Sequence, residues 1–208
     1  KVDPQLTGIT AFQELGFSFI EMGPIIVKNP TLQLPPQWQE QHISFSYTEE
    51  KVLLKNALKL VITKNIRIPL FARLDESLNK QELYICITHL TPYVDGFFLH
   101  ARQVEALDSD GGATLYQIIS ADSAKTIRKV PASVRGFIID APVTATEDRY
   151  SEHSNAFPLL HQAVQDLKKS FPDYPIMTSG AVESPSQALC LKESGADLIM
   201  LSEGYVKT

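Results

Sequence analysis

The sequence predicts an α/β protein whose parallel strands close into a barrel, and two observations carry this expectation. Apolar runs without polar alternation recur along the chain, and such runs are typical of parallel strands that are buried on both faces. The segments between them begin with helix-capping residues, so strand and helix alternate throughout. The spacing of this alternation favours a (β/α)8 barrel, the TIM barrel, over an open sheet.

Composition limits the domain count and the classes of partner. The chain has 208 residues, of which 44% are hydrophobic and 21% are charged, which suffices for one sizeable core but not for two domains. A net charge of −5, without interleaved basic and aromatic residues, argues against a nucleic-acid partner. No apolar run is long enough to span a bilayer, and Lys1 does not begin a signal peptide. Cys86 and Cys190 are expected as buried fillers of helices in a reducing compartment, so we expect a cytoplasmic protein.

The most completely specified unit lies at residues 174–205. An apolar run at 175–178 predicts a strand, and the Ser-Pro-Ser-Gln motif at 184–187 supplies an N-cap, a proline at the first helical position and a capping-box partner. The helix should end at Gly195, and the apolar run 196–201 predicts a second buried strand. Because a helix joins them, the two strands should be parallel.

Glycine follows both of these strands, at Gly180 and Gly204. Loops after the last two strands of a (β/α)8 barrel are the usual phosphate site, where backbone N–H groups approach the anion. The alternative is that each glycine only turns the chain. The sequence leaves both interpretations open.

The remaining elements follow the same pattern. A polar, proline- and glutamine-rich stretch at 24–47 predicts an excursion on one face of the barrel. Helices are expected after Thr48 and Ser77, each as an N-cap residue. The main strands are predicted at residues 17–23, 67–74, 94–100, 114–120, 134–140, 174–179 and 197–202.

This count gives seven strands rather than eight. The simplest account is that residues 1–208 form one barrel domain of a longer protein, with the first strand before Lys1 and the last helix after Thr208. We therefore expect a barrel that is incomplete within this numbering and that a strand from outside it completes.

Several stretches together resemble the dihydroorotate dehydrogenases, most closely the quinone-linked, membrane-associated class. They are AFQELGFSFIEMGPIIVKNP, LTPYVDGFFL, TLYQIISADSAKTI, VRGFIIDAPVTA and PIMTSGAVESPSQALCLKESGADLIMLSEGYV, which follow the order of the family's units along nearly the whole chain. The resemblance implies FMN at the carboxyl-terminal mouth of the barrel. It also implies oxidation of dihydroorotate to orotate in pyrimidine biosynthesis, with hydride passing to the flavin and a proton to a serine or cysteine base.

Several family positions are occupied by other residue types. Arg73 and His100 stand where the family has asparagines, and Asp140 lies where it has a threonine beside an asparagine. The catalytic serine falls near Gln103, and an amide cannot act as a base at neutral pH. The fifth-strand lysine is matched by Gln117, which cannot offset negative charge on a reduced flavin.

The implied cofactor-binding residues are Gly180, Ala181, Ser202, Gly204 and Gln117. Gly180 and Gly204 keep the family pattern, whereas Ala181 and Ser202 depart from it. The resemblance therefore makes FMN possible, and the side chains make its binding doubtful.

Two functions from different classes follow. The chain is an FMN-dependent oxidoreductase of dihydroorotate dehydrogenase type, or it is a degenerate barrel, a pseudoenzyme that serves as a binding or scaffolding module. Arg73, His100 and Asp140 are the candidate residues at the rim, where they would hold a small anion or pair with one another. The histidines lack metal-ligand spacing, so no metal is assigned.

Overall fold

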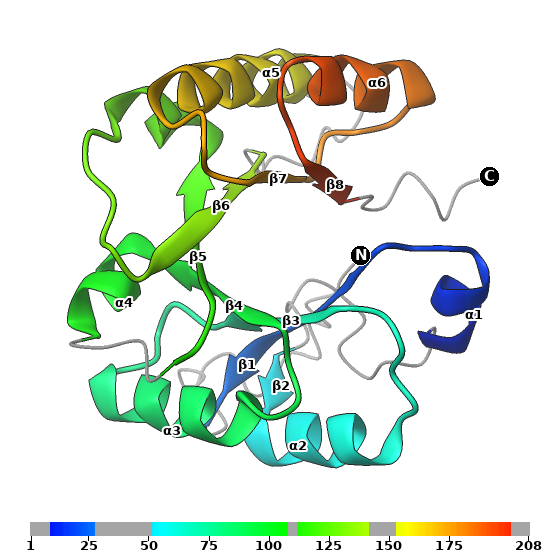
Figure 1. Cartoon of the computed structure of the whole chain (residues 1–208), viewed down its shortest axis with the longest axis vertical. Coiled ribbons are helices and arrows are strands. Elements are labelled where there is room, and N and C mark those ends of the chain that lie inside the picture. Colours follow the sequence, from blue (N-terminus) through cyan, green and yellow to red (C-terminus); the bar gives the residue numbers. More distant parts are fainter. Residues whose placement is uncertain (1–8, 28–50, 108–111, 142–152, 201–208) are drawn as a thin grey trace, which may run out of the picture.

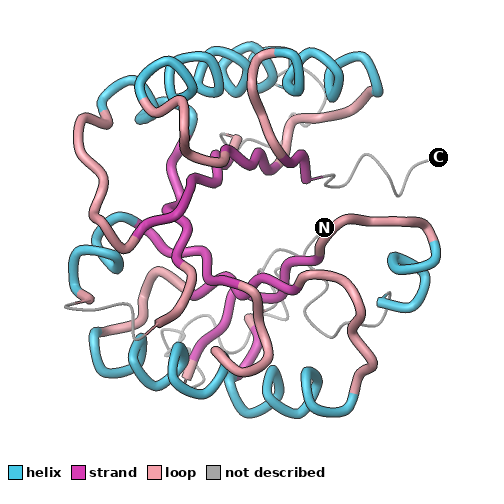
Figure 2. Tube along the Cα trace, viewed as in Figure 1, coloured by secondary structure: helices cyan, strands magenta, loops and turns pink. Residues whose placement is uncertain are grey.

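The structure is a computed structural model that describes residues 9–27, 51–107, 112–141 and 153–200. These residues form one eight-stranded parallel sheet in the order β2-β1-β3-β4-β5-β6-β7-β8. Figure 2 shows that the sheet curls into most of a barrel, with the helices on its outside. The strands are β1 (Ile20–Ile26), β2 (Val52–Leu53), β3 (Leu70–Leu74), β4 (Gly96–His100), β5 (Leu115–Ser120), β6 (Val134–Asp140), β7 (Ile176–Ser179) and β8 (Leu198–Met200).

Apart from α1, which precedes β1, the helices connect successive parallel strands and cover the outer face of the sheet (Figure 1). Within the described ranges, none of them combines the length and the apolarity needed to cross a bilayer. They are α1 (Ile9–Glu14), α2 (Leu54–Thr63), α3 (Lys80–Leu90), α4 (Ala101–Ala106), the 3-10 helix η2 (Ala121–Thr126), α5 (His153–Ser170) and α6 (Pro185–Glu193).

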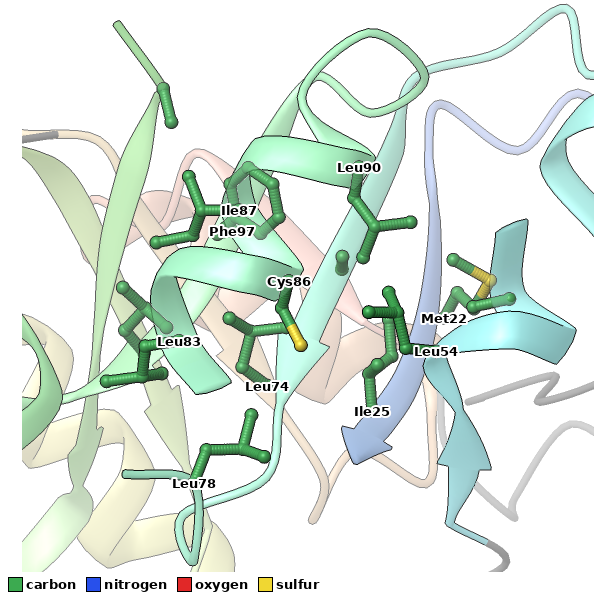
Figure 3. Close-up of a cluster of buried hydrophobic side chains, with 14 of the residues drawn as sticks. Met22, Ile25, Leu54, Leu74, Leu78, Leu83, Cys86, Ile87, Leu90 and Phe97 are labelled. Atoms are coloured by element: carbon green, nitrogen blue, oxygen red, sulfur yellow. The ribbon is translucent and has the colours of Figure 1, made fainter. Parts of the chain in front are cut away.

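Each strand packs apolar side chains on both faces, as its uninterrupted apolar run predicts. The outer face packs against the helices, where α2 and α3 lie over the first strands; Figure 3 shows Leu74 of β3 beside Leu83 and Cys86 of α3. The inner face fills the barrel with a cluster formed by Phe71, Phe98, Ile118, Ile138, Met177 and Met200. This inner cluster makes the barrel a packed core rather than a channel.

The seven predicted main strands are all present, with ends shifted by a few residues. The prediction missed β2, a two-residue strand that pairs with Ile25 and Ile26 at the end of β1. It lies where we expected the helix that follows Thr48; that helix instead begins at Leu54, and Thr48 itself is outside the described residues.

One predicted helix cap is confirmed and another is wrong. Ser184 caps α6, accepting from the Gln187 N–H at 3.3 Å, with Pro185 at the first turn. For α3 the cap is Asn79, which accepts from the Glu82 N–H at 3.0 Å, and not Ser77. The Ser77 hydroxyl donates instead to Asp75, so it is not available to the helix.

The two cysteines differ in their environments. Cys86 is fully buried in α3, and burial raises the pKa of its thiol to about 12. Cys190 in α6 is half-buried, so its prediction as a buried filler is wrong. Both thiols are free.

Two aspartates hold the starts of neighbouring strands together. Asp95 precedes β4, and its carboxylate accepts from the Leu70 N–H of β3 at 2.8 Å, while its own N–H donates to the Leu70 carbonyl. Asp197 makes the same pair of bonds with Ile176 of β7. Each aspartate thereby satisfies backbone groups at the bottom of the barrel and fixes the register of two parallel strands.

The sheet does not close within the described residues. β8 pairs with β7, and β1 pairs with β3 along its length and with β2 at its end; β1 and β8 are not paired with each other. Direct pairing of β1 with β8, which would close the barrel, is therefore not found among these residues. We call this open boundary between β1 and β8 the seam.

Gly136 on β6 offers a direct test of the packing inside the barrel. A Cβ at this position would lie 2.6 Å from the Pro175 carbonyl oxygen and 3.0 Å from the Tyr116 ring. We expect Gly136→Ala to lower the free energy of unfolding by about 1–3 kcal/mol, because the backbone at Pro175, just before β7, must move. Urea unfolding measures this, and the control Arg135→Ala, at an exposed neighbour, should change stability by no more than about 0.5 kcal/mol. An equal effect of both substitutions would contradict the packing.

Candidate functional site

Polar side chains gather on the inner face where the strands end. Phe71 and Phe98 lie in the inner cluster, and because side chains alternate along a strand, Arg73 and His100 face the same side two residues later. Asp140 stands in the same relation to Ile138. The three rim residues expected from the sequence therefore share the mouth of the barrel, and Arg73 and Asp140 contact each other directly.

Arg73 lies between two carboxylates. Its Nε donates to Glu21 Oε1 at 2.5 Å, and its Nη1 and Nη2 donate to the two oxygens of Asp140 at 2.7 and 3.1 Å. Glu21 is 2% exposed, whereas the side chain of Asp140 is 33% exposed. The cluster thus joins β1, β3 and β6, and two carboxylates share one guanidinium.

Burial and charge act against each other in this cluster. Burial raises the pKa of Glu21 above its ordinary value, and Arg73 only partly offsets this. Burial alone would lower the pKa of Arg73, but the carboxylates of Glu21 and Asp140 raise it. The guanidinium therefore stays charged, and the cluster as a whole carries no net positive charge.

Sequence reasoning missed Glu21. Its signal was an acidic residue inside the apolar run Phe17–Gly23, two positions after Phe19, which packs against the inner cluster. An isolated carboxylate in a buried strand needs a partner. The carboxylate of Glu21 therefore predicted a cation on the inner face of a neighbouring strand. Arg73 on β3 is that cation.

An apolar floor lies beneath the charged residues. The Arg73 guanidinium sits 5.9 Å from the centroid of the Phe98 ring, within the range of a cation–π contact. Phe98 stacks on Phe71 with 5.2 Å between ring centroids, and Tyr116 meets both edge-on. These rings fill the barrel below Arg73. The polar part of the mouth therefore extends no deeper than the Arg73 guanidinium.

His100 is the third rim residue. It is half-buried, and burial lowers the pKa of its imidazole. Its charge responds to Arg73 and Asp140, which places it in the same electrostatic environment. The imidazole is therefore neutral at pH 7, and a neutral imidazole can accept a proton.

Gln103 lies near the sequence position that the resemblance matches to the family's catalytic serine. In this structure it has a structural role. It is buried in α4; its Oε1 accepts from the His100 N–H at 2.9 Å, and its Nε2 donates to the Asp75 carbonyl at 2.8 Å. Both ends of the amide are thus used to tie the end of β4 to the loop after β3. This arrangement leaves the amide no part in proton transfer.

Asp75 anchors that loop by a second ion pair. Lys51 Nζ lies 2.7 Å from its carboxylate, and the Ser77 N–H donates to it at 3.0 Å. Burial alone would raise the pKa of Asp75, but the hydrogen bonds from Lys51 and Ser77 lower it below its ordinary value. The cation of Lys51 is consequently paired as well.

The proposed phosphate loop is described only in part. Gly180 and Ala181 both have positive φ angles, +84° and +55°, and a non-glycine residue seldom adopts this conformation. A Cβ on Gly180 would lie 3.3 Å from the Cβ of Ala141, so the turn favours glycine at that position. Ser202 and Gly204 lie outside the described residues.

Gln117 lies on the other face of the sheet. Its neighbours Tyr116 and Ile118 face the barrel interior, so the Gln117 side chain points toward the helices. A one-residue difference in register exchanges the two faces of a strand. The inward-facing residue at this level of β5 is therefore the apolar Ile118, and Gln117 does not reach the mouth.

Comparison with solved structures establishes what this fold resembles. Dihydroorotate dehydrogenase from Eimeria tenella in complex with ferulenol matches with a TM-score of 0.66 and 13% sequence identity, covering 98% of this chain and 74% of that one. The ligand-free form of the same enzyme matches with a TM-score of 0.64 and 14% identity, covering 98% and 77%. The chain has a dihydroorotate dehydrogenase-like fold. No protein-family model and no curated protein matches its sequence.

The sequence resemblance led us to expect FMN at the mouth, and the described residues there do not supply the partners that a flavin needs. Negative charge develops on a flavin as hydride arrives, and a protein stabilises it with a cation or with directed donors. Among the inward-facing strand residues near the mouth that are described, Arg73 is the one lysine or arginine, and both of its neighbours are carboxylates. Within the same part of the chain, no three His, Cys, Asp or Glu residues are grouped to hold a metal ion.

Replacement of Arg73 tests the cluster. Arg73→Met should lower the free energy of unfolding by about 3–5 kcal/mol at pH 8, because Glu21 loses the cation that compensates its buried charge. A carboxyl whose folded-state pKa lies above its unfolded value, near 4.5, contributes stability below that value and loses it as the pH rises through the folded-state pKa. Urea unfolding should therefore give a smaller loss at pH 5 than at pH 8. Arg135→Met, at an exposed arginine on β6, is the control, and a loss that is equal at both pH values would contradict the account.

Proposed function

We propose that this chain is a dihydroorotate dehydrogenase-like barrel that acts as a binding or scaffolding module without flavin chemistry. The observation that carries the proposal is the position of Arg73, whose guanidinium is bound to Glu21 and Asp140. An arginine in this state has its charge compensated within the protein. It is not available to a phosphate, a carboxylate or a reduced flavin.

The electrostatics of the mouth support the same conclusion. Orotate, dihydroorotate and FMN are anions, and a site for anions needs donors or cations that are not already compensated. Of the other cations near the mouth, Lys51 is paired with Asp75, and the Arg102 guanidinium donates to the Glu76 carbonyl. A small molecule that binds at this mouth should therefore be uncharged or cationic, since Asp140 is partly exposed there.

The position of the family's proton acceptor adds a second argument. Both ends of the Gln103 amide are engaged in structural hydrogen bonds, and an amide is no base at neutral pH. The absence of a base at this position would block proton abstraction even if flavin bound. A partner for the reduced flavin and a base are separate requirements, and Gln117 and Gln103, which the resemblance matches to these two positions, would meet neither.

One observation favours the alternative, an FMN-dependent oxidoreductase. His100 lies at the rim with a lowered pKa, so its neutral imidazole could replace the family's base. The backbone turn at Gly180 and Ala181 also keeps the positive φ angles that expose N–H groups to a phosphate. This alternative predicts tight FMN binding, which makes the two functions separable by one titration.

The proposal includes the domain organisation and the cellular location of the protein. We infer that residues 1–208 form a single barrel domain. The free thiols of Cys86 and Cys190 fit a reducing compartment, consistent with a cytoplasmic location.

Titration of the full-length protein with FMN tests the proposal. We expect no saturable quenching of flavin fluorescence up to about 100 μM, corresponding to a binding free energy weaker than about −5.5 kcal/mol. We also expect no bleaching when dihydroorotate is added. Tight stoichiometric quenching, followed by bleaching with dihydroorotate, would refute the binding-module proposal and favour the oxidoreductase.

Asp140→Asn is the matched variant for this titration. It keeps the size of the side chain and removes one of the two negative charges beside Arg73. If the carboxylates are what exclude anions, this variant should bind FMN at least about tenfold more tightly than the unchanged protein. Equally weak binding by both proteins would show that the charge of Asp140 is not the cause.

A further inference from the structure

Three polar residues lie side by side on the inner face where β5, β6 and β7 end. Asp140 of β6 is in register with Ser120 of β5 on one side and with Ser179 of β7 on the other. Each of the three follows an apolar residue of the inner cluster by two positions, so each side chain faces the mouth. Adjacent strands are about 4.8 Å apart. A carboxylate therefore lies between two hydroxyl groups, one strand spacing from each.

Asp140 keeps acceptor sites that the described protein does not use. Its two oxygens accept one hydrogen bond each from Arg73, at 2.7 and 3.1 Å, whereas a carboxylate offers about four lone-pair sites. The Asp140 side chain is 33% exposed and the Arg73 side chain 13% exposed. The unused lone pairs are therefore open to a ligand that enters the mouth.

The two serines place further oxygen atoms beside this carboxylate. The half-buried Ser179 hydroxyl has no hydrogen-bond partner among the described residues. The Ser120 hydroxyl is exposed and lies 2.7 Å from that of Ser123, where either group can donate. A hydroxyl oxygen accepts as well as donates, so both serines can accept a hydrogen bond from the same ligand as Asp140.

The charges beside this row favour a cation. Arg73 contacts two carboxylates, Glu21 and Asp140, and its single charge offsets one of them. Lys51 does not supply the second charge, because it is paired with Asp75. One negative charge is therefore left over where Asp140 meets the solvent, and a positively charged ligand would compensate it.

A primary ammonium is the cation that suits these groups. It has three N–H donors, and the row offers one carboxylate and two hydroxyls as acceptors. A quaternary ammonium has no N–H group and is recognised by aromatic faces, but the Arg73 guanidinium already lies over Phe98, 5.9 Å from the ring centroid. A metal ion needs several ligands, and the described part of the chain groups no three His, Cys, Asp or Glu residues for one.

We propose that the mouth of the barrel binds a primary ammonium group through Asp140, with the hydroxyls of Ser120 and Ser179 on either side. The inference rests on the proposed function, because a flavin would occupy the same face of the barrel. It narrows the uncharged or cationic ligands expected above to organic amines. The ammonium donates hydrogen bonds and transfers no proton.

Chemical-shift titrations of the full-length, ¹⁵N-labelled protein at pH 8 test the proposal. The probes are benzylamine, benzyl alcohol and benzoate, which share one ring and are cationic, neutral and anionic. Benzylamine should shift the Asp140 and Ser179 amides saturably and bind at least about tenfold more tightly than benzyl alcohol, because a hydrogen bond between charged groups is the stronger one. Benzoate should cause no saturable shift.

Three variants separate the local charge from the overall charge. Asp140→Asn should weaken benzylamine binding at least about tenfold, and Ser179→Ala, which removes one neutral acceptor, about threefold. Asp173→Asn is the matched control, because Asp173 is exposed in the turn before β7, at the opposite end of the strands. It removes the same charge and should change the affinity by less than about twofold.

Lower pH gives a second readout in the unchanged protein. Burial raises the pKa of Glu21, so its carboxylate takes up a proton as the pH falls, and Arg73 can then offset Asp140 fully. A proton on His100 adds positive charge in the same region. The charged groups around Glu21 are Arg73 and Asp140, which face it, and Lys192 and Asp197, which line the same cavity at the seam. Benzylamine should therefore bind more weakly at pH 5 than at pH 8.

Equal affinities for benzylamine and benzyl alcohol would overturn the proposal. So would benzylamine binding that Asp140→Asn leaves unchanged, or shifts that occur only away from the mouth. An FMN titration of the same sample distinguishes this failure from that of the proposed function. Tight FMN binding contradicts the proposed function, whereas a protein that binds neither FMN nor benzylamine contradicts the amine site alone.

Discussion

A single guanidinium that two carboxylates share is the interaction on which the mouth of this barrel depends. Arg73 extends from β3 to Glu21 on the adjacent β1 and to Asp140 on β6, across the interior. The aromatic rings beneath exclude water and lower the local dielectric, which strengthens each charge–charge contact. The same surroundings make a missing partner costly, so the three side chains depend on one another.

This arrangement connects the fold to the proposed function. Parallel strands of a (β/α)8 barrel bring their carboxyl ends to one face, and that face is where ligands bind in such folds. Here the inward-facing charges of that face bind each other. The fold resembles that of dihydroorotate dehydrogenase, yet fold and chemistry are separable, because chemistry resides in the side chains at the mouth.

Much of the fold could be predicted from the sequence because its signals are local. Ser184, Pro185 and Gln187 define a helix start by themselves, and the uninterrupted apolar runs identify the strands. The cap of α3 could not be chosen this way, since Ser77 and Asn79 are both good N-cap residues. Only the contact of Ser77 with Asp75 decides between them.

The candidate site was predictable in part, because its prediction depends on which face of each strand a residue occupies. His100 and Asp140 end two apolar runs, and Arg73 is the last residue but one of a third, so their place at the rim follows from the strands alone. The resemblance implied that Gln117 binds the cofactor, but one residue of register separates it from the inward-facing Ile118, and the resemblance does not fix that register. The partner of Arg73 could not be found from local patterns, since Glu21 lies 52 positions away in the sequence.

The central claim is that the charge of Arg73 is compensated within the protein and does not bind anionic ligands. The most direct measurement follows the Nε–H resonance of Arg73 in the full-length, ¹⁵N-labelled protein during a titration with orotate. The account predicts a resonance that is protected from exchange with water and keeps its position throughout the titration. A saturable shift of that resonance, with loss of its contact to Glu21, would contradict the account.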